Sequence, residues 1–182
     1  MNLKTDEIET PIGALLLVAF EDALCALGFL DRWTGLDRAL RQRFGAFRLD
    51  REPNPNGASD RLRAYFAGDL AALDHLRVNA GGTPFQQQVW AALRAIPVGR
   101  TASYSDIARA IGSPRAVRAV GAANGSNPVS IVVPCHRVIR ADGHLCGYGG
   151  GIQRKRWLLQ HEAQGVLRFV AEAVGGGAKH HS

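Results

Sequence analysis

The sequence predicts an α/β N-terminal half followed by a mostly helical C-terminal half that contains a helix-turn-helix. Two apolar runs and an amphipathic helix pattern fill the first half, whereas capped helices follow one another in the second. The segment Asn79–Gly82 separates the halves, and the charge changes there. Residues 1–82 carry 10 Lys and Arg against 12 Asp and Glu, and residues 83–182 carry 12 against 4. We therefore expect domains and a tail with these bounds: 1–80, 83–165 and 166–182.

The N-terminal half begins with two apolar runs, 12–19 and 23–30, that are separated by three residues and predict a β-hairpin. A helix is expected from about 34 to 45, because apolar residues recur every four positions there between arginines. Ser59 is expected to cap a second helix that Gly68 ends. A last short strand is expected at Leu76 and Val78.

The C-terminal half is predicted from its helix caps. Thr83 can cap a helix with proline in its first turn and Gln86 at the third position, as in a capping box. Ser103 can cap the next helix, with Asp106 in the same role. Ser113 is expected to cap a helix over 115–124, which completes the helix-turn-helix. A final helix is expected over 155–162, followed by a tail with a disordered polar end.

Composition places the chain among soluble globular proteins. It has 182 residues, 46% of them apolar and 21% charged, and no apolar run approaches the length of a membrane helix. The three cysteines have wide, patternless spacing, which argues against a disulfide framework. No secretory leader is visible. We expect a reducing compartment, the cytoplasm, and no membrane partner.

The stretch Ile131–Ile139 contains the candidate nucleophile. The run Ile131–Val133 predicts a short buried strand that Pro134 ends, so Cys135 lies at a strand end or turn. A thiol reacts as thiolate, which a neighbouring histidine or cation favours, and His136 follows directly. The alternative is that Cys135 is a small buried apolar residue, which is the common case for free cysteines.

The basic second half favours a polyanionic partner, with nucleic acid as the first candidate. Arg118 lies early in the second helix of the helix-turn-helix, beside residues that are small enough for close approach to a nucleic-acid backbone: Ala116, Ala119, Gly121, Ala122 and Ala123. Two alternatives remain at this point. The charge can serve solubility alone, and helix hairpins are common in proteins that do not bind DNA.

Several short motifs stand out in the second half of the chain. The most specific is Pro134-Cys135-His136-Arg137-Val138 with Asn127-Pro128 before it. The others are Tyr104, Arg118-Ala119-Val120-Gly121, Gly147-Tyr148, and Trp157-Leu158-Leu159 with Glu162. Taken together they resemble the O6-alkylguanine-DNA alkyltransferases, also called methylated-DNA–protein-cysteine methyltransferases, in their bacterial single-protein form. The resemblance is strong over residues 83–163. It implies a ribonuclease H-like N-terminal domain and a winged helix-turn-helix-like C-terminal domain.

The resemblance implies a role for each residue of a nucleophile, base and orienter set. Cys135 would attack the alkyl carbon on guanine O6, and on O4 of alkylthymine as well. His136 would take the thiol proton through a water, and Glu162 would orient the imidazole. The product is a thioether that nothing in the pocket can hydrolyse, so each chain would react once. Neither a cofactor nor a metal is implied.

The resemblance also implies how the base is held. Tyr104 would donate to guanine N3, the Gly149 N–H would contact O6, and the carbonyls of Cys135 and Val138 would accept the exocyclic amine. Asn127 would hold the turn beneath the cysteine. Two further residues complete the expected substrate and DNA contacts: Arg137 and Tyr148.

The implied partner is double-stranded DNA whose damaged nucleotide is flipped out of the stack. Arg118 would fill the vacated space, while Ala116, Ala119 and Gly121 would let the helix enter the minor groove. The protein is expected to be a monomer in solution, with cooperative binding along DNA left open.

Three positions depart from the family's pattern. Val117 stands where alanine is usual, Gly149 replaces serine or alanine, and Cys146 is a local variation. Other functions remain as alternatives: a lesion-binding protein without transfer activity, a regulator switched by methylation, and, less favoured, a cysteine hydrolase. In the lesion-binding relatives the cysteine is replaced, which Cys135 argues against.

Overall fold

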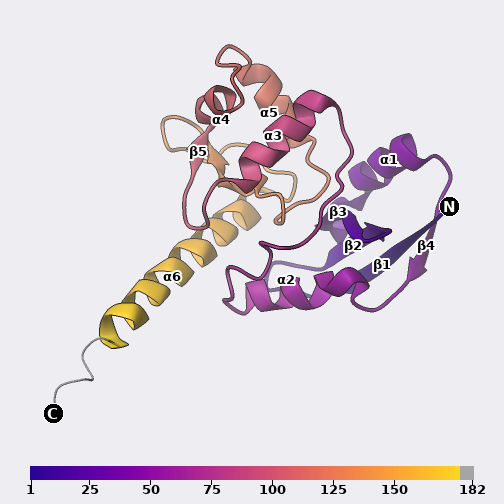
Figure 1. The fold of residues 1–182 in the computed structure, drawn as a ribbon, viewed down its shortest axis with the longest axis horizontal. Helices are drawn as coiled ribbons and strands as arrows, with labels where there is room; N and C mark the ends of the chain where they lie inside the picture. The colour runs from indigo at the N-terminus through magenta and orange to yellow at the C-terminus, as the bar shows by residue number, and fades with distance from the viewer. Residues whose placement is uncertain (177–182) are drawn as a thin grey trace.

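The computed structural model describes the backbone of residues 1–176 and the side chains of residues 1–169. The chain forms a sheet with two helices in its N-terminal half and a helical cluster in its C-terminal half, joined by an extended linker (Figure 1). The last helix starts beside both halves and then extends away from them. The two-part α/β and helical organisation expected from the sequence is present.

The N-terminal sheet has four strands in the order β3-β2-β1-β4. Their bounds are β1 Asn2–Ile8, β2 Leu15–Phe20, β3 Ala23–Phe29 and β4 Arg48–Arg51. β2 is antiparallel to both β1 and β3, so the predicted hairpin is confirmed, and β4 is parallel to β1. β1 was not predicted, because the charged residues Lys4, Asp6 and Glu7 interrupt its apolar residues, and Asp6 is itself buried.

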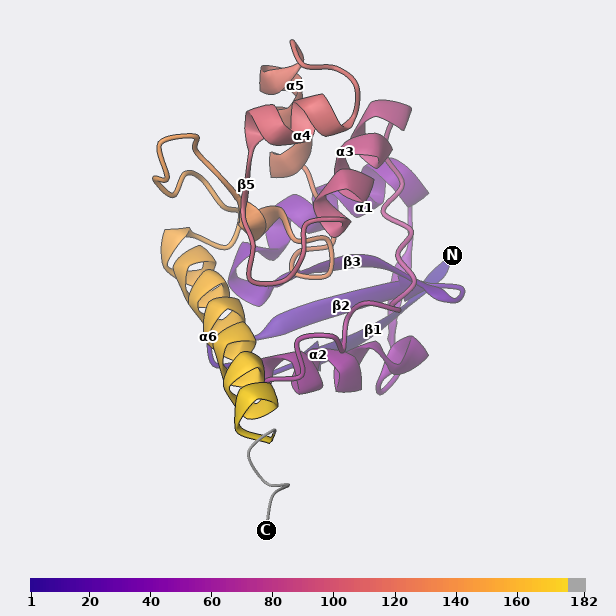
Figure 2. The same ribbon diagram turned by 60° about the vertical axis from the view of Figure 1, so that its left-hand side comes forward.

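Helix α1 (Trp33–Phe44) and helix α2 (Ala58–Phe66) cover opposite faces of the sheet, as Figure 2 shows. α1 packs Leu40 on a cluster that includes Val18 and Cys25. α2 packs Leu62 and Tyr65 into the larger core that continues into the helical half. This follows from the strands, whose alternate residues point to opposite faces.

The outer edge of β3 is paired by two segments that lie far apart in the sequence. Leu24 N–H donates to the Arg77 carbonyl and its own carbonyl accepts from Asn79, each at 2.9 Å. Leu27 N–H donates to Pro128 at 2.9 Å, and its carbonyl accepts from Ser130 at 3.0 Å. The loop that precedes the candidate nucleophile is therefore anchored on the N-terminal sheet.

The C-terminal half consists of short helices around a two-stranded parallel ladder. In chain order these are α3 Pro84–Arg94, β5 Ala102–Ser103, α4 Tyr104–Ala110, α5 Val117–Gly125, the 3-10 helix η3 Cys135–Arg137, β6 Val138–Ile139 and α6 Ile152–Gly176. Both predicted capping boxes are confirmed. Thr83 accepts from Gln86 N–H and Ser103 from Asp106 N–H, while each partner's side chain accepts in return.

Two predicted caps are wrong. Ser59 lies inside α2 and is buried, and its hydroxyl donates to Asp6 Oδ2 at 2.6 Å instead of accepting from the helix. Ser113 forms a turn that Ala116 N–H closes at 2.9 Å, so α5 begins at Val117 rather than at residue 115. In both cases another partner or a tighter turn takes the place of the expected cap.

Two further elements differ from prediction. Ile131–Val133 is buried but is not a strand, because Ile131 has φ of +72° and the chain turns tightly there. The final helix does not end at Glu162 and continues to Gly176, so the expected tail from residue 166 is helical over most of its length. The polar end, where disorder was expected, lies outside the described residues.

Candidate active site

Cys135 lies in a cavity of about 310 Å³ between α5 and the loop 147–149. The thiol residue is 6% exposed. The wall opposite the loop comes from the start of α4 and one face of α5: Tyr104, Gly121, Asn124 and Gly125. The cavity therefore lies between helix and loop, with the nearly buried thiol residue on its wall.

The backbone at Cys135 is fixed by its preceding loop. Cys135 is the first residue of the short helix η3, and its N–H donates to Val133 O at 2.8 Å. The Asn127 amide donates to the same carbonyl at 2.8 Å and accepts from Val129 N–H at 2.9 Å. The expected place of Asn127, beneath the turn, agrees with these contacts.

His136 and Glu162 are both fully buried and joined by a hydrogen bond. His136 Nε2 lies 2.7 Å from Glu162 Oε1. A carboxylate only accepts, so Nε2 carries the hydrogen and Nδ1 keeps its lone pair. Nδ1 is buried and has no hydrogen-bond partner among the described residues. Burial lowers the pKa of His136 despite the neighbouring Glu162, which keeps the imidazole neutral and able to accept a proton.

Glu162 is ionised through contacts from two elements, η3 and α2. Arg137 donates to it from Nε and from a terminal nitrogen, both at 2.9 Å, and Tyr65 Oη donates to Oε1 at 2.8 Å. Burial alone would raise the pKa of this carboxyl, but His136 and Arg137 outweigh it and lower the pKa to about 2.

The position of Arg137 corrects one expectation. Its side chain is 11% exposed, and its remaining donor contact goes to Ile96 O at 2.8 Å. The guanidinium thus faces the interior and serves the carboxylate, so Arg137 is removed from the expected DNA contacts.

The Cys135 thiol is protonated in the resting protein. Burial raises its pKa, and the Asn127 side chain and the Lys155 charge oppose that rise without cancelling it. Lys155 is itself fully buried and donates to Val138 O at 2.6 Å and to Cys146 O at 3.2 Å. A base is therefore needed to form the thiolate, while a nearby cation stabilises it once formed.

Tyr104 faces the same cavity from the first turn of α4. Its hydroxyl lies 3.1 Å from Cys146 Sγ, at hydrogen-bond distance. Burial, followed by this contact, raises the pKa of Tyr104, so the phenol stays a proton donor. On the other side, Gly149 lines the cavity and the Tyr148 ring stands edge-on to His136, with centroids 6.5 Å apart.

The exposed face of α5 lies beside the cavity mouth. Its exposed residues are Arg118, Ala119, Ala122 and Gly125, one long cation among small side chains. Gly121, which is half-buried on the adjacent face of α5, lines the cavity. Ala116, the residue before α5, is half-buried.

Sequence reasoning missed two residues of this site. Tyr65 comes from the other half of the chain, 97 positions before Glu162, and its pattern indicated only a core position. Lys155 lies in the first turn of α6 between Arg154 and Arg156, and its sequence context did not distinguish it from an exposed charge. Residue spacing in the sequence indicated neither the Tyr65 contact nor the Lys155 contacts.

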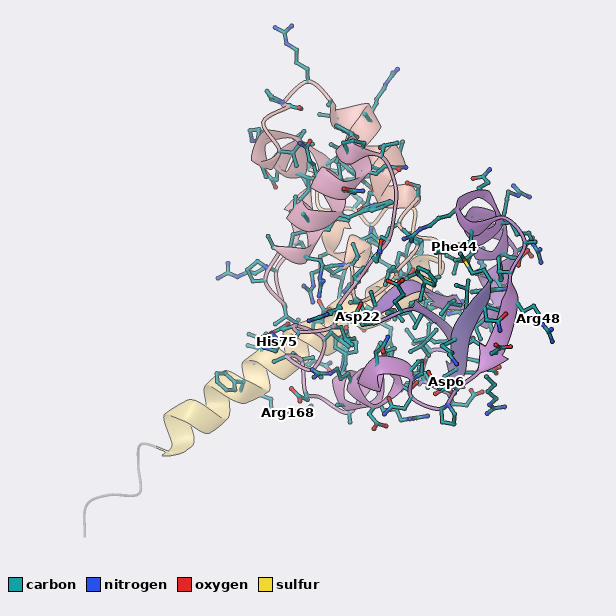
Figure 3. All side chains as sticks on the ribbon, turned by 45° about the vertical axis from the view of Figure 1, so that its right-hand side comes forward. Asp6, Asp22, Phe44, Arg48, His75 and Arg168 are labelled. Atoms are coloured by element: carbon teal, nitrogen blue, oxygen red, sulfur yellow. The ribbon has the colours of Figure 1, made fainter. Side chains whose placement is uncertain are left out.

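Cys25 and His75, the cysteine and the histidine of the N-terminal half, do not meet. Cys25 is buried near Phe44 below α1, whereas His75 is exposed beside the linker on the α6 side, as the labelled Phe44 and His75 show in Figure 3. Within residues 1–169 no three His, Cys, Asp or Glu side chains gather as metal ligands would. In the same part of the chain no helix is long and apolar enough to cross a membrane.

Two protein families match the chain in succession. Residues 4–80 match "6-O-methylguanine DNA methyltransferase, ribonuclease-like domain", and residues 84–164 match "6-O-methylguanine DNA methyltransferase, DNA binding domain". The methylated-DNA–protein-cysteine methyltransferase of Salmonella typhimurium is 48% identical over 171 residues, which cover 92% of this chain and 99% of the relative. That of Mycobacterium tuberculosis is 49% identical over 158 residues, covering 85% and 89%.

Solved structures show the same architecture. A crystal structure of the Mycobacterium tuberculosis OGT in complex with DNA has a TM-score of 0.74 at 44% identity and covers 91% of this chain and 94% of that one. The O6-methylguanine-DNA methyltransferase of Pyrococcus kodakaraensis has a TM-score of 0.66 at 29% identity, covering 88% and 98%. The expected order of a ribonuclease-like domain and a helical DNA-binding domain is confirmed.

Proposed function

The chain belongs to the 6-O-methylguanine DNA methyltransferase family, and from this premise we propose that Cys135 is its alkyl acceptor. It is a DNA-repair enzyme, a methylated-DNA–protein-cysteine methyltransferase. The observation that supports the residue assignment is Cys135 at the floor of the cavity, followed directly in the chain by His136, whose buried ring is hydrogen-bonded to Glu162. A lesion-binding protein without transfer activity is not favoured, because a thiol occupies that floor.

His136 starts the reaction as the base. Its free Nδ1 takes the Cys135 proton through a water, and Glu162 holds the imidazole and stabilises the charge that forms. The thiolate then attacks the alkyl carbon on guanine O6. One S–C bond forms and the C–O bond breaks, with the electron pair leaving on guanine. The thioether is stable, so each chain reacts once, and the displacement needs no cofactor.

Tyr104 stabilises the leaving base. Its raised pKa keeps the hydroxyl protonated, so it can donate to guanine N3 as negative charge develops. The Gly149 N–H contacts O6 from the loop, and the carbonyls of Cys135 and Val138 accept the exocyclic amine. Because a carbonyl has two lone pairs, Val138 can accept from the base as well as from Lys155.

Double-stranded DNA with an alkylated guanine is the partner, and alkylated thymine is a second substrate. The cavity cannot be reached by a base in the stack, so the nucleotide is flipped. The small residues on and before α5 (Ala116, Ala119 and Gly121) allow entry into the minor groove, and Arg118 fills the vacated stack.

We place the domains at 1–80 and 83–165, with a monomer in solution. The three free cysteines support a cytoplasmic location.

The acceptor assignment is tested with a duplex that carries O6-methylguanine labelled in its methyl group. One label per chain should move to Cys135, located by peptide mass analysis. Cys135→Ala should take up none, while Cys25→Ala, at a buried cysteine outside the cavity, should react normally. Transfer that survives in Cys135→Ala would refute the assignment.

The role of Arg118 is tested by comparing two substrates. Arg118→Ala should slow transfer from duplex DNA by about tenfold or more, since an inserted side chain offsets an unstacking cost of a few kcal/mol. Reaction with the free base O6-benzylguanine should stay within about twofold of the original rate. Arg156→Ala removes one exposed charge far along the chain and is the matched control. Equal losses on both substrates would remove the proposed role.

A further inference from the structure

A second thiol, Cys146, contacts the residue that receives the leaving base. Cys146 is half-buried and is not among the described residues that line the cavity around Cys135. Its Sγ lies 3.1 Å from Tyr104 Oη, and among the described residues it is the one hydrogen-bond partner of that hydroxyl. The mechanism above uses Tyr104 as a donor and gives Cys146 no part.

The backbone at Cys146 is held by a buried cation. Cys146 lies in the segment 140–151, which contains neither helix nor strand. Its carbonyl accepts from Lys155 Nζ at 3.2 Å, and the same ammonium donates to Val138 O at 2.6 Å. Lys155 is fully buried. The loop is therefore anchored at Cys146, which keeps the thiol within reach of Tyr104.

The contact between Cys146 and Tyr104 can have either polarity, because a thiol and a phenol each carry one hydrogen and lone pairs. A phenol is a stronger donor than a thiol, so without a bound base Tyr104 donates to Sγ. Guanine N3 is a stronger acceptor than sulfur, so a bound base attracts the phenol hydrogen. The thiol hydrogen is then free to turn toward the Tyr104 oxygen.

We propose that Cys146 is a positioning residue for Tyr104: it holds the phenol hydrogen in the resting protein, and it donates to the phenol oxygen once guanine N3 accepts that hydrogen. This rests on the proposed function of Cys135. Each hydrogen stays on its own heavy atom, so the balance of methyl transfer is unchanged. A chain of hydrogen bonds from thiol to phenol to N3 makes the phenol a better donor. Its effect is largest in the transition state, where negative charge develops on the base.

Two substitutions at position 146 test whether the hydrogen bond is needed. Cys146→Ser keeps one donor and an acceptor, whereas Cys146→Ala removes both. His144→Ala changes an exposed side chain of the same loop, which pairs with Asp142, and is the matched control. Single-turnover rates over a range of duplex concentrations give the maximal rate and the half-saturating concentration separately.

The duplexes carry either O6-methylguanine or O6-methyl-3-deazaguanine, in which a C–H group replaces N3 and cannot accept from Tyr104. With O6-methylguanine, Cys146→Ala should lower the maximal rate about fivefold, the size of one neutral hydrogen bond, and leave the half-saturating concentration within twofold. Cys146→Ser and His144→Ala should stay within twofold of the parent protein in both quantities. With the 3-deaza substrate, Cys146→Ala should also react within twofold of the parent.

An equal loss on both substrates would overturn the proposal, because Cys146 would then act on the loop and not through Tyr104 and N3. An unchanged rate in Cys146→Ala on O6-methylguanine would overturn it too, as would a Cys146→Ser protein as slow as Cys146→Ala. The acceptor assignment stands in all three cases. A parent protein that transfers no methyl group to Cys135 would instead overturn the proposed function.

Discussion

His136 can act as a base because its two ring nitrogens have different surroundings. Nε2 is bound to the Glu162 carboxylate, and Nδ1 is free to accept a proton. The arrangement orients the ring and stabilises the imidazolium in the same way as the carboxylate of a catalytic triad. In the proposed mechanism, Glu162 therefore helps to form the thiolate by stabilising the base that removes its proton.

We predict that Glu162→Gln slows methyl transfer by about 100-fold, which is the size of a typical general-base contribution. The variant also loses about 3 kcal/mol of stability, because the buried Arg137 no longer has a counter-charge. Single-turnover kinetics and urea denaturation measure the two effects. Glu9→Gln, at an exposed carboxylate, is the control. An unchanged transfer rate in a folded Glu162→Gln protein would contradict the role.

At the scale of residues, the sequence predicted the parts of the site that are local or belong to a motif. Cys135, Asn127 and Tyr104 line one cavity, and His136 directly follows Cys135, because helix caps and the Pro134 turn position them. Tyr65 and Lys155 were not predictable, since their roles depend on how α2 and α6 pack. The resemblance placed Arg137 among the substrate and DNA contacts, whereas its buried guanidinium lies against Glu162.

Helix α2 connects the N-terminal sheet to the reaction centre. It packs on the sheet through Leu62 and places the Tyr65 hydroxyl on Glu162, which α6 supplies. The N-terminal half thus contributes a hydrogen bond to the site as well as support for the fold.

Tyr65→Phe tests this contribution because it keeps the ring and removes only the hydroxyl. We expect a loss of about 2 kcal/mol in unfolding free energy, the usual value for a hydrogen bond to a charged group. Methyl transfer should slow several-fold, and its pH profile should shift, since the carboxylate that faces His136 loses one donor. Thermal denaturation and single-turnover rates at several pH values check this. A variant that loses stability but keeps both rate and pH profile would limit Tyr65 to a structural role.

Helix caps with a reciprocal partner were predicted correctly, whereas caps inferred from a single serine were not. Thr83 and Ser103 cap as expected because the side chains three residues later accept a hydrogen bond from their backbone N–H groups in return. These side chains are Gln86 and Asp106. Ser59 and Ser113 have no such partner, and a buried carboxylate or a tight turn redirects them. The buried run at Ile131 was read as a strand because apolar composition does not reveal a left-handed φ.

The folding stability of the whole protein depends on pH through the ionisation of Glu162. The pKa of this carboxyl falls from its ordinary 4.5 to about 2 in the folded protein, so its contribution to stability is complete above pH 4.5. It is lost as the pH falls toward 2, when the folded protein must also take up the proton. The loss corresponds to about 3 kcal/mol.

We therefore predict that the free energy of unfolding declines between pH 4.5 and 2 by about 3 kcal/mol more in the parent protein than in Glu162→Gln. Urea denaturation at a series of pH values gives both curves. The comparison cancels the pH dependence that comes from Asp6, another buried carboxylate with a lowered pKa, because both proteins contain it. Parallel curves for the two proteins would show that Glu162 titrates at its ordinary pKa.

The edge of β3 is closed by residues 77–79 and 128–130, which satisfy its amide and carbonyl groups. An uncovered strand of such apolar composition is a template on which other chains assemble. Residues 1–80 produced alone would keep the first cover and lose the second, so they should associate into β-rich aggregates. The loop below the reactive sulfur thus also protects solubility, and repair competence and resistance to aggregation would be lost together if it lifted from the sheet.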